Sequence, residues 1–314
     1  MRTISIYDGS VELQQLRYVL AVAETRNFTR AAENCFVVQS ALSHQIKSLE
    51  QELGFQLFAR TSRRVELTSA GAAFLPSARA ALDAADRAVA DSAAAVGQIR
   101  GTLSVGVIPT VTAVDIPAAL GKFHRAHPAV PIRLRGGNSD AFINSITNGA
   151  LDVAVLGLAT STPPEKVATE VLARERLVAV VSAKHRLASR RRLRLRDLAD
   201  DTFVDFPEGS PGRTQSDLAF AAAGITRAVA FEAMGTELIL DLVRQDLAST
   251  LLPPGLVTPS AELATIPLLD GPTRTQYLAW SSFNPTPAAA AFISLLKTDQ
   301  RRSASSAGVG SDHS

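Results

Sequence analysis

The sequence has almost no cysteine and no long hydrophobic run. Cys35 is the single cysteine among 314 residues, so an internal disulfide framework is excluded. A membrane-spanning helix needs roughly 18 or more consecutive apolar residues, and no such run occurs. The first residues, MRTISIYDGS, also lack the apolar core of a signal peptide. These absences predict a cytoplasmic protein that has no contact with a membrane.

Clusters of metal ligands and a strong net charge are also missing. The five histidines are scattered, and the nearest pair, His124 and His127 in FHRAHP, is not accompanied by cysteine or carboxylate ligands. We therefore predict neither a metal nor a cofactor. The net charge is only +2, so a nucleic-acid function must rest on where the basic groups lie.

Composition divides the chain into three parts. Residues 11–71 contain short amphipathic helices and a basic loop, and residues 72–97 are rich in alanine and strongly periodic. From Gly101 onward the chain alternates between strand and helix patterns, first from LSVGV to LDVAVLG and again from RLVAVVSA to STLLPP. This alternation predicts two α/β lobes with parallel strands. We expect one lobe at about 101–166 and 272–297, the other at about 167–271, and a disordered tail at 298–314.

The stretch FTRAAENCFVVQSALSHQIKSLEQELG, residues 28–54, changes its helical periodicity at CFVVQ. Asn27 can cap a first short helix, Val37 can fill the turn, and Gly54 can end a second helix. Apolar residues recur along the second helix at helical spacing, which predicts one buried face. That face comprises Ala41, Leu42, Ile46, Leu49 and Leu53. The pattern predicts a helix-turn-helix in which the first helix braces the second.

The opposite face of the second helix is polar. It carries Gln39, Ser40, Ser43, His44 and Lys47, whose side chains can hydrogen-bond base edges or phosphates. An ordinary helical hairpin with a solvated face is the alternative. The following GFQLFARTSRRVELTSAG favours DNA binding, because it places three arginines in a turn typical of a β-wing. These are Arg60, Arg63 and Arg64.

Residues 12–80 resemble the DNA-binding domain of LysR-type transcriptional regulators in the elements LRYVLAVAE, NFTRAAE, QSALSHQIKSLEQELG, LFAR and LTSAG. The two lobes, within residues 101–297, resemble the family's effector-binding domain. The resemblance implies an α/β protein with an N-terminal all-α winged helix-turn-helix, a linker helix and a two-lobed α/β effector domain of periplasmic-binding-protein type. It also implies a regulator rather than an enzyme. The implied partners are double-stranded promoter DNA, a small-molecule effector, RNA polymerase and further copies of the chain.

For DNA binding, we expect base contacts from the early turns of the recognition helix and phosphate contacts from basic groups around it. The expected set is Thr29, Arg30, Gln39, Ser40, Ser43, His44, Lys47, Arg60, Arg63 and Arg64. Most relatives have Ser or Thr at Val38, so we expect this helix to start later, with Ser40 supplying the capping hydroxyl. Relatives usually begin where this chain has Val11, so we expect residues 1–10 to be disordered or absent from the natural protein.

Apolar residues recur every seven positions along the alanine-rich segment. Leu75, Leu82, Val89 and Val96 share this spacing, with small residues between them. The heptads predict self-association, and the family resemblance implies a dimer of linker helices that assembles further into a tetramer. In the alternative, this helix packs on its own effector domain.

Four stretches follow predicted strands where a ligand cleft of α/β lobes is expected: IPTVTAVD, GGNSDA, DFPEGSPG and AMGTEL. Hydroxyls and helix N-terminal amides dominate them, which favours a small carboxylate as effector. A neutral ligand, a domain that mainly mediates oligomerisation, and a solute-binding protein are the alternatives. The candidate contacts, some of which could instead cap helices or shape turns, are Thr110, Thr112, Asn138, Ser139, Phe206, Gly235 and Thr236.

Overall fold

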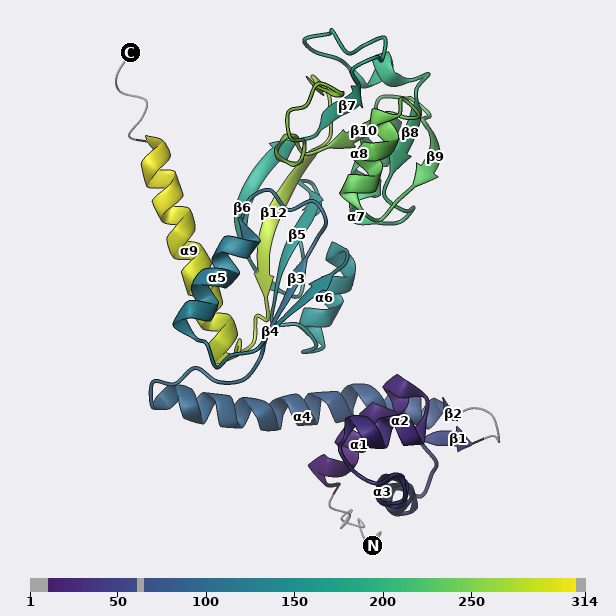
Figure 1. The fold of residues 1–314 in the computed structure, drawn as a ribbon, viewed down its shortest axis with the longest axis vertical. Coiled ribbons are helices and arrows are strands. Elements are labelled where there is room, and N and C mark those ends of the chain that lie inside the picture. The colour runs from purple at the N-terminus through teal and green to yellow at the C-terminus, as the bar shows by residue number, and fades with distance from the viewer. Residues whose placement is uncertain (1–10, 61–64, 309–314) are drawn as a thin grey trace, which may run out of the picture. The chain divides into compact units, whose positions relative to one another are not determined.

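The computed structural model describes residues 11–60 and 65–308, with the backbone alone at Arg60 and at 301–308. Figure 1 shows a helical first part and an α/β second part. None of the helices in the described residues has the length and apolar character needed to cross a membrane. The chain divides into two compact units, Met1–Ser92 and Ala93–Ser314.

The first unit combines three short helices, a two-stranded hairpin and a long helix. Val22, Leu42 and Ile46 are fully buried in one core between the short helices. Burial of each such side chain stabilises the fold by roughly 1.5–3 kcal/mol. This arrangement confirms the winged helix-turn-helix. The elements are α1 (Leu13–Thr25), α2 (Phe28–Asn34), α3 (Gln39–Leu53), β1 (Phe58–Arg60), β2 (Val65–Leu67) and α4 (Ser69–Ala95).

The start of α3 differs from the prediction. The Oδ1 atom of Asn27 caps α2 by accepting the Arg30 N–H at 3.0 Å, but no side chain caps α3. The helix nevertheless begins at Gln39 rather than later, because the carbonyl of Val38 already accepts the first helical hydrogen bonds. Ala41, expected on the buried face, is exposed. The core-facing stripe is therefore narrower than the predicted one.

The long helix α4 packs on α1 within the same chain. Ala78 and Leu82 form a small buried cluster with Leu16 of α1. The sequence predicted Leu82 in a seam between two chains, but its buried position is already filled by contacts inside the first unit. Val89 and Val96, the next heptad positions, are 64% and 74% exposed. The apolar heptad positions that remain exposed are therefore Val89 and Val96, which follow Leu82.

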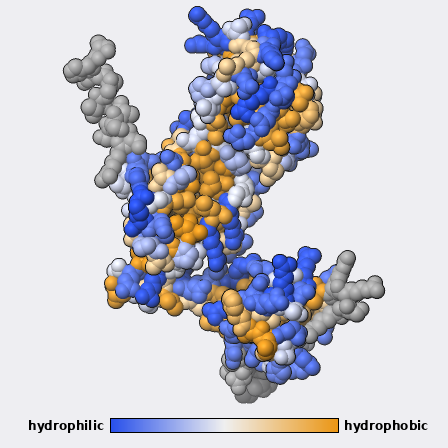
Figure 2. All heavy atoms as spheres, in the orientation of Figure 1, coloured by the Kyte–Doolittle hydropathy of each residue, from blue (hydrophilic) through white to orange (hydrophobic). Residues whose placement is uncertain are grey.

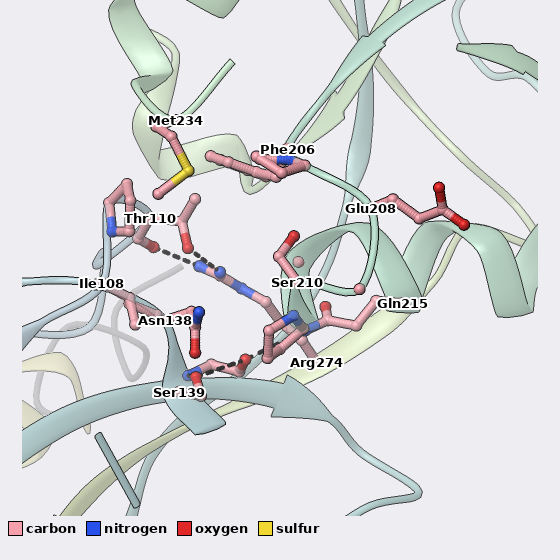
Figure 3. Close-up of a pocket in the computed structure, with 17 residues that line it drawn as sticks. Ile108, Thr110, Asn138, Ser139, Phe206, Glu208, Ser210, Gln215, Met234 and Arg274 are labelled. Carbon is pink, nitrogen blue, oxygen red and sulfur yellow. Dashed lines mark hydrogen bonds between the residues drawn. The ribbon is translucent and has the colours of Figure 1, made fainter. Parts of the chain in front are cut away.

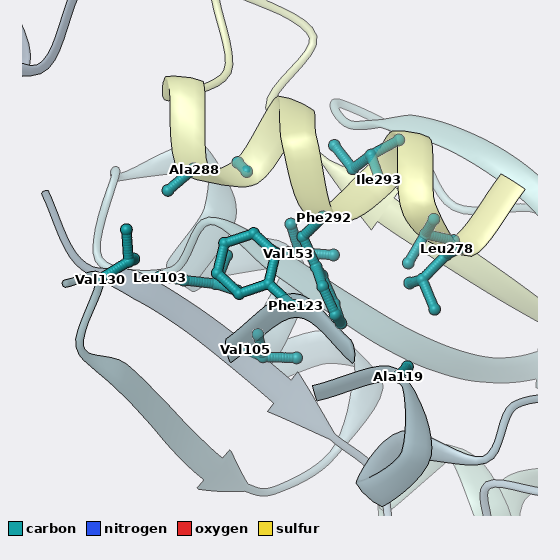
Figure 4. Close-up of a cluster of buried hydrophobic side chains, with 12 residues drawn as sticks. Leu103, Val105, Ala119, Phe123, Val130, Val153, Leu278, Ala288, Phe292 and Ile293 are labelled. Carbon is teal, nitrogen blue, oxygen red and sulfur yellow. The ribbon is translucent and has the colours of Figure 1, made fainter. Parts of the chain in front are cut away.

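The first lobe of the second unit is a five-stranded sheet covered by helices. Its strand order is β4-β3-β5-β12-β6, with β3 parallel to β4 and β5 and with β12 antiparallel to β5 and β6. Phe123 and Phe292 meet edge to face in the core beneath α5 and α9 (Figure 4). The elements are β3 (Leu103–Val107), α5 (Ile116–Ala126), β4 (Ile132–Gly136), α6 (Ser139–Thr147), β5 (Val153–Ala159), β6 (Ala168–Arg176), β12 (Thr273–Trp280) and α9 (Pro287–Gly308).

The second lobe contains two small sheets and two helices. β7 lies between β10 and β11, while β8 pairs in parallel with β9. Phe203 and Phe220 pack edge to face in one of its two buried clusters. Its main elements are β7 (Val178–Ser182), β8 (Thr202–Asp205), α7 (Pro211–Ala222), β9 (Ala228–Glu232), α8 (Thr236–Arg244), β10 (Thr250–Leu252) and β11 (Leu263–Pro267), with short 3-10 turns at Leu195–Leu198 and Pro254–Leu256.

Two predicted boundaries need correction. The sequence assigned residues 167–176 to the second lobe, but β6 pairs along the whole of β12 and belongs to the first lobe's sheet. The predicted disordered tail is helical as far as Gly308, because α9 continues past Lys297. Polar contacts fix this extension: Asp299 pairs with Lys122 at 2.7 Å, and the Nε2 atom of Gln300 donates to the Leu172 carbonyl. Residues 1–10 and 309–314 lie outside the described residues.

The basic run RRRLRLRD, Arg190 to Asp197, forms a solvated edge of the second lobe. Its arginines are exposed, whereas Leu193 and Leu195 are buried in the lobe's core. The leucines occupy the core, and the arginines beside them lie at the surface. In Figure 2 hydrophobic residues gather over the middle of the first lobe, while the outer end of the second lobe is mainly hydrophilic.

Candidate functional site

The first candidate site is the outward face of the helix-turn-helix. On α3, Gln39, Ser40, His44 and Lys47 are exposed and Ser43 is half-buried. Thr29 and Arg30 on α2 are exposed as well. Burial of the apolar stripe of α3 against α1 and α2 places these polar side chains on the outward face. The surface has the donors and acceptors that reading a DNA major groove requires.

The wing is held to α3 by hydrogen bonds from backbone N–H groups to a carboxylate side chain. The Oε1 atom of Glu50, on α3, accepts the N–H groups of Leu57 and Phe58 at 2.8 and 3.1 Å. Gly71 at the start of α4 lies so close to the wing that a Cβ atom there would be 2.1 Å from the Leu57 carbonyl oxygen. Glycine in LTSAG is thus required by close packing. Arg63 and Arg64 lie outside the described residues, and the side chain of Arg60 is not described.

The second candidate site is a cavity of about 250 Å³ between the two lobes of the second unit (Figure 3). Ile108, Phe206 and Met234 contribute apolar wall, and Met234 is 63% exposed. The remaining lining is largely polar or backbone. It consists of Pro109, Thr110, Gly137, Asn138, Ser139, Gly157, Pro207, Glu208, Gly209, Ser210, Pro211, Gly212, Gln215 and Arg274.

Two helices begin at this cavity, one from each lobe. The Oδ1 atom of Asn138 caps α6 by accepting the Ala141 N–H at 2.9 Å. The Oγ atom of Ser210 caps α7 by accepting the Arg213 N–H at 3.4 Å. The other first-turn N–H groups have no acceptor within their helix, and both helix dipoles place partial positive charge there. The cavity is therefore suited to an electron-rich ligand group.

Arg274 on β12 lies in the cavity wall with only 3% of its surface exposed. Its Nη1 and Nη2 atoms donate to the hydroxyl and the carbonyl of Thr110, each at 2.6 Å. Its Nε and Nη2 atoms lie 2.7 and 2.6 Å from the Oε1 atom of Glu175. A guanidinium has five N–H donors, so one Nη1 donor has no partner among the described residues. Burial lowers the pKa of Arg274, and Glu175 opposes that shift.

A buried ion pair supports the same wall from the second lobe. Asp205 ends β8 just before Phe206, and its Oδ2 atom lies 2.7 Å from the Nη1 atom of Arg227. Burial raises the pKa of the Asp205 carboxyl, while the charge of Arg227 opposes the shift. The Oδ1 atom of Asp205 accepts the Phe206 N–H at 2.7 Å, which fixes the peptide that carries this ring.

Comparison with known proteins identifies both parts of the chain. Residues 13–72 match the family model for bacterial regulatory helix-turn-helix proteins of the lysR family, and residues 97–301 match the LysR substrate binding domain. The chain belongs to the LysR family of transcriptional regulators. It is thus a DNA-binding regulator with a substrate-binding domain, and not an enzyme. Members of this family bind DNA and effector ligands and act as oligomers.

Named LysR relatives align with most of the chain. The transcriptional dual regulator GltC of Bacillus subtilis is 32% identical over 243 residues, which cover 77% of this chain and 81% of GltC. The dual regulator OxyR of Escherichia coli is 30% identical over 250 residues, covering 79% and 81%. Full-length CbnR, solved in complex with its target DNA, superposes with a TM-score of 0.68 at 26% identity, covering 92% of this chain and 99% of CbnR.

The structure brings four of the seven predicted effector residues of this LysR protein to the cavity: Thr110, Asn138, Ser139 and Phe206. The side chains of Thr110, Asn138 and Ser139 each form a hydrogen bond within the protein. The hydroxyl of Ser139 donates to the Gly157 carbonyl at 3.2 Å and accepts the Gly157 N–H at 3.0 Å, so it joins α6 to β5. Whether these residues contact a ligand is still a prediction.

The other three predicted residues lie outside this cavity lining, and whether they contact a ligand also stays a prediction. The hydroxyl of Thr112 donates to Glu175 at 3.1 Å. The hydroxyl of Thr236 donates to the carbonyl of Pro109 at 3.2 Å, which joins the second lobe to the first. Gly235 is the N-cap of α8, and no atom lies within 4 Å of the place where its Cβ would be.

Sequence reasoning missed the cavity residues that come from other parts of the chain. Arg274 was not predicted because it lies on β12, 164 positions after the Thr110 hydroxyl that it contacts. Arg213, which directly follows the predicted stretch DFPEGSPG, pairs instead with Asp217 at 3.0 Å and Glu232 at 3.1 Å. An arginine at the start of a predicted strand that ends in apolar residues, TRTQYLAW, is the signal that could have identified Arg274.

Proposed function

We propose that this LysR-family regulator reads promoter DNA with the outward face of α3 and responds to a small carboxylate bound between its effector lobes. In this division, residues 11–71 bind DNA, residues 72–97 link and dimerise, and residues 101–297 bind the effector. The base contacts come from Gln39, Ser40 and Ser43, which lie in the first two turns of the recognition helix α3.

The meeting of two helix N-termini with Arg274 at one cavity supports a carboxylate as the effector. A carboxylate has two oxygens that can accept from the first-turn N–H groups of α6 and α7 and from the remaining Nη1 donor of Arg274. The apolar wall formed by Ile108, Phe206 and Met234 suits a short hydrocarbon body. The volume of about 250 Å³ limits the ligand to modest size.

Peroxide sensing through a disulfide, which the similarity to hydrogen peroxide-inducible activators could suggest, does not fit this chain. A disulfide within one chain needs two cysteines, and Cys35 is the single one. It lies in the DNA-binding unit, and burial raises the pKa of its thiol, which lowers its reactivity.

Cytoplasmic location, the assembly of dimers into tetramers and contact with RNA polymerase are further parts of the proposal.

A pair of substitutions at Met234 tests the charge of the effector. Thermal-shift screening of small carboxylates and their neutral amides on the full-length chain comes first, followed by calorimetry on the best ligand. Met234 is exposed at the cavity, so Met234→Glu adds a negative charge without disturbing the core, and Met234→Gln is the neutral control. For a carboxylate, Met234→Glu should weaken binding about tenfold more than Met234→Gln, since like charges repel across the cavity.

The outcomes separate the alternatives. Equal affinities of the Met234→Glu and Met234→Gln proteins, together with stronger binding of the amide, favour a neutral ligand and refute the carboxylate. No ligand from either series combined with normal DNA binding favours a domain that mainly mediates oligomerisation. Gly235→Ala, outside the cavity and with open space around its Cβ, is the control for substitutions near this site.

A further inference from the structure

The turn of the helix-turn-helix exposes a phenylalanine in an unfavourable backbone conformation. Phe36 is 95% exposed, the highest value among the large hydrophobic residues found exposed in the described part of the chain. Its φ angle is +56°, in the left-handed region. Residues with a Cβ adopt this region at a cost, and glycine or asparagine normally occupies it. Both the exposed ring and the positive φ angle of Phe36 therefore reduce the stability of the fold.

The local hydrogen bonds explain why the backbone adopts this conformation. The Phe36 N–H donates to the Glu33 carbonyl at 3.1 Å, and the Val37 N–H donates to the Ala32 carbonyl at 3.0 Å. This is the Schellman pattern that ends a helix, with Phe36 at the position where glycine is preferred. Val37 and Ala32 pack in the core, so the turn itself is stable. The ring of Phe36 contributes nothing to that core.

The place of Phe36 indicates what its ring meets. It precedes Gln39, the first residue of the recognition helix, by three positions, and Val38 between them is 68% exposed. Two exposed apolar side chains, Phe36 and Val38, thus directly precede the polar face of α3. In this class of motif, the N-terminal end of the recognition helix contacts the base edges in the DNA groove. The major groove presents one apolar group, the C5 methyl of thymine. Phenylalanine is among the side chains that contact it.

We propose that Phe36 is a specificity-determining residue that packs its ring on a thymine methyl group at the edge of the recognised sequence. The inference rests on the DNA-binding function of the chain and extends it to a preference for thymine over cytosine at one position. Burial of one methyl group changes the affinity roughly fourfold, so the preference is modest and confined to that base pair.

The test combines a protein variant with a DNA variant. A duplex is first selected from a random library by the full-length protein, which checks DNA binding itself. Each thymine in it is then replaced, one at a time, by deoxyuridine, which lacks only the C5 methyl group. Phe36→Asn removes the ring and keeps a residue that tolerates a positive φ. Phe283→Asn removes an 83% exposed phenylalanine from the other unit and is the control.

For the parent protein, one deoxyuridine position should weaken binding about fourfold. Phe36→Asn should weaken binding to the original duplex by a similar factor, lose the response to that deoxyuridine, and melt at an unchanged or higher temperature. Phe283→Asn should behave as the parent in both DNA assays. The combined changes are then far from additive, as expected for two groups in contact.

Three results would overturn the inference. If Phe36→Asn binds both duplexes as tightly as the parent, the ring does not contact DNA. If it loses affinity but still responds to every deoxyuridine as the parent does, the ring contacts another group, such as the sugar. If its particle mass in light scattering falls, the ring mediates contact with a second copy of the chain. In each case selection of a duplex by the parent still establishes DNA binding.

Discussion

Replacing Arg274 by methionine tests the polar network that forms the cavity wall. The change removes three groups that donate to Thr110 and Glu175 and leaves the Glu175 carboxylate, with only 15% of its side chain exposed, without its cation. Removal of one partner from a buried pair costs about 3–5 kcal/mol. For a unit of this size that cost lowers the melting temperature by roughly 6–20 °C.

An exposed pair of the same length is the matched control. Lys122 and Asp299 lie 2.7 Å apart, but half of the lysine side chain is exposed, so Lys122→Met should cost less than about 1 kcal/mol. Glu175→Gln combined with Arg274→Met should recover part of the loss, since no uncompensated charge remains. Scanning calorimetry on the full-length proteins gives the transition of the effector unit. Equal shifts for Arg274→Met and Lys122→Met would refute the assignment of a buried, mutually dependent pair.

The remaining predictions concern the DNA-binding unit. Leu82→Asp should lower the melting temperature of this unit because it places a charge against Leu16. Val89→Asp, at an exposed heptad position, should leave the melting temperature unchanged and reduce the particle mass in light scattering. The opposite pattern would place Leu82 in the seam between two chains. Gln39→Ala should reduce discrimination between operator and non-specific DNA by roughly 1–3 kcal/mol in competition assays, and an unchanged preference would contradict base reading. Burial raises the pKa of the Cys35 thiol, so less thiolate exists at pH 7.5. Alkylation should therefore be slower than for a free cysteine, and peroxide should not alter DNA binding. A fast reaction that abolishes DNA binding would contradict this.

Local patterns predicted the helix-turn-helix well. The spacing of Leu42, Ile46 and Leu49 fixes which face of α3 is buried, and all three are fully buried. Asn27 caps α2 as its type and position suggest, since a short polar side chain can reach the first-turn N–H groups. Capping preference failed at Val38, because the backbone carbonyl alone can start a helix whose later turns pack against a core.

Contacts between distant segments could not be predicted in the same way. The heptad at Leu82 shows that one face of α4 is apolar but not whether α1 or another chain covers it. β6 reads as an isolated alternating strand, and only its pairing with β12 assigns it to the first lobe. Arg274 reaches the cavity because β12 returns to the first sheet late in the chain, beside β5, whose paired residues lie more than 100 positions earlier.

The position of Arg274 also indicates how ligand binding and the angle between the two lobes can depend on each other. Arg274 and Glu175 lie opposite each other on β12 and β6, next to the two places where the chain passes from one lobe to the other. Arg274 holds the carbonyl of Thr110, and the neighbouring carbonyl of Pro109 accepts the hydroxyl of Thr236 from the second lobe. A ligand that takes the remaining Nη1 donor acts on a side chain whose other bonds fix this loop. We therefore expect its affinity to depend on the interlobe angle, and such a difference in affinity is what an effector needs in order to shift a regulator between states.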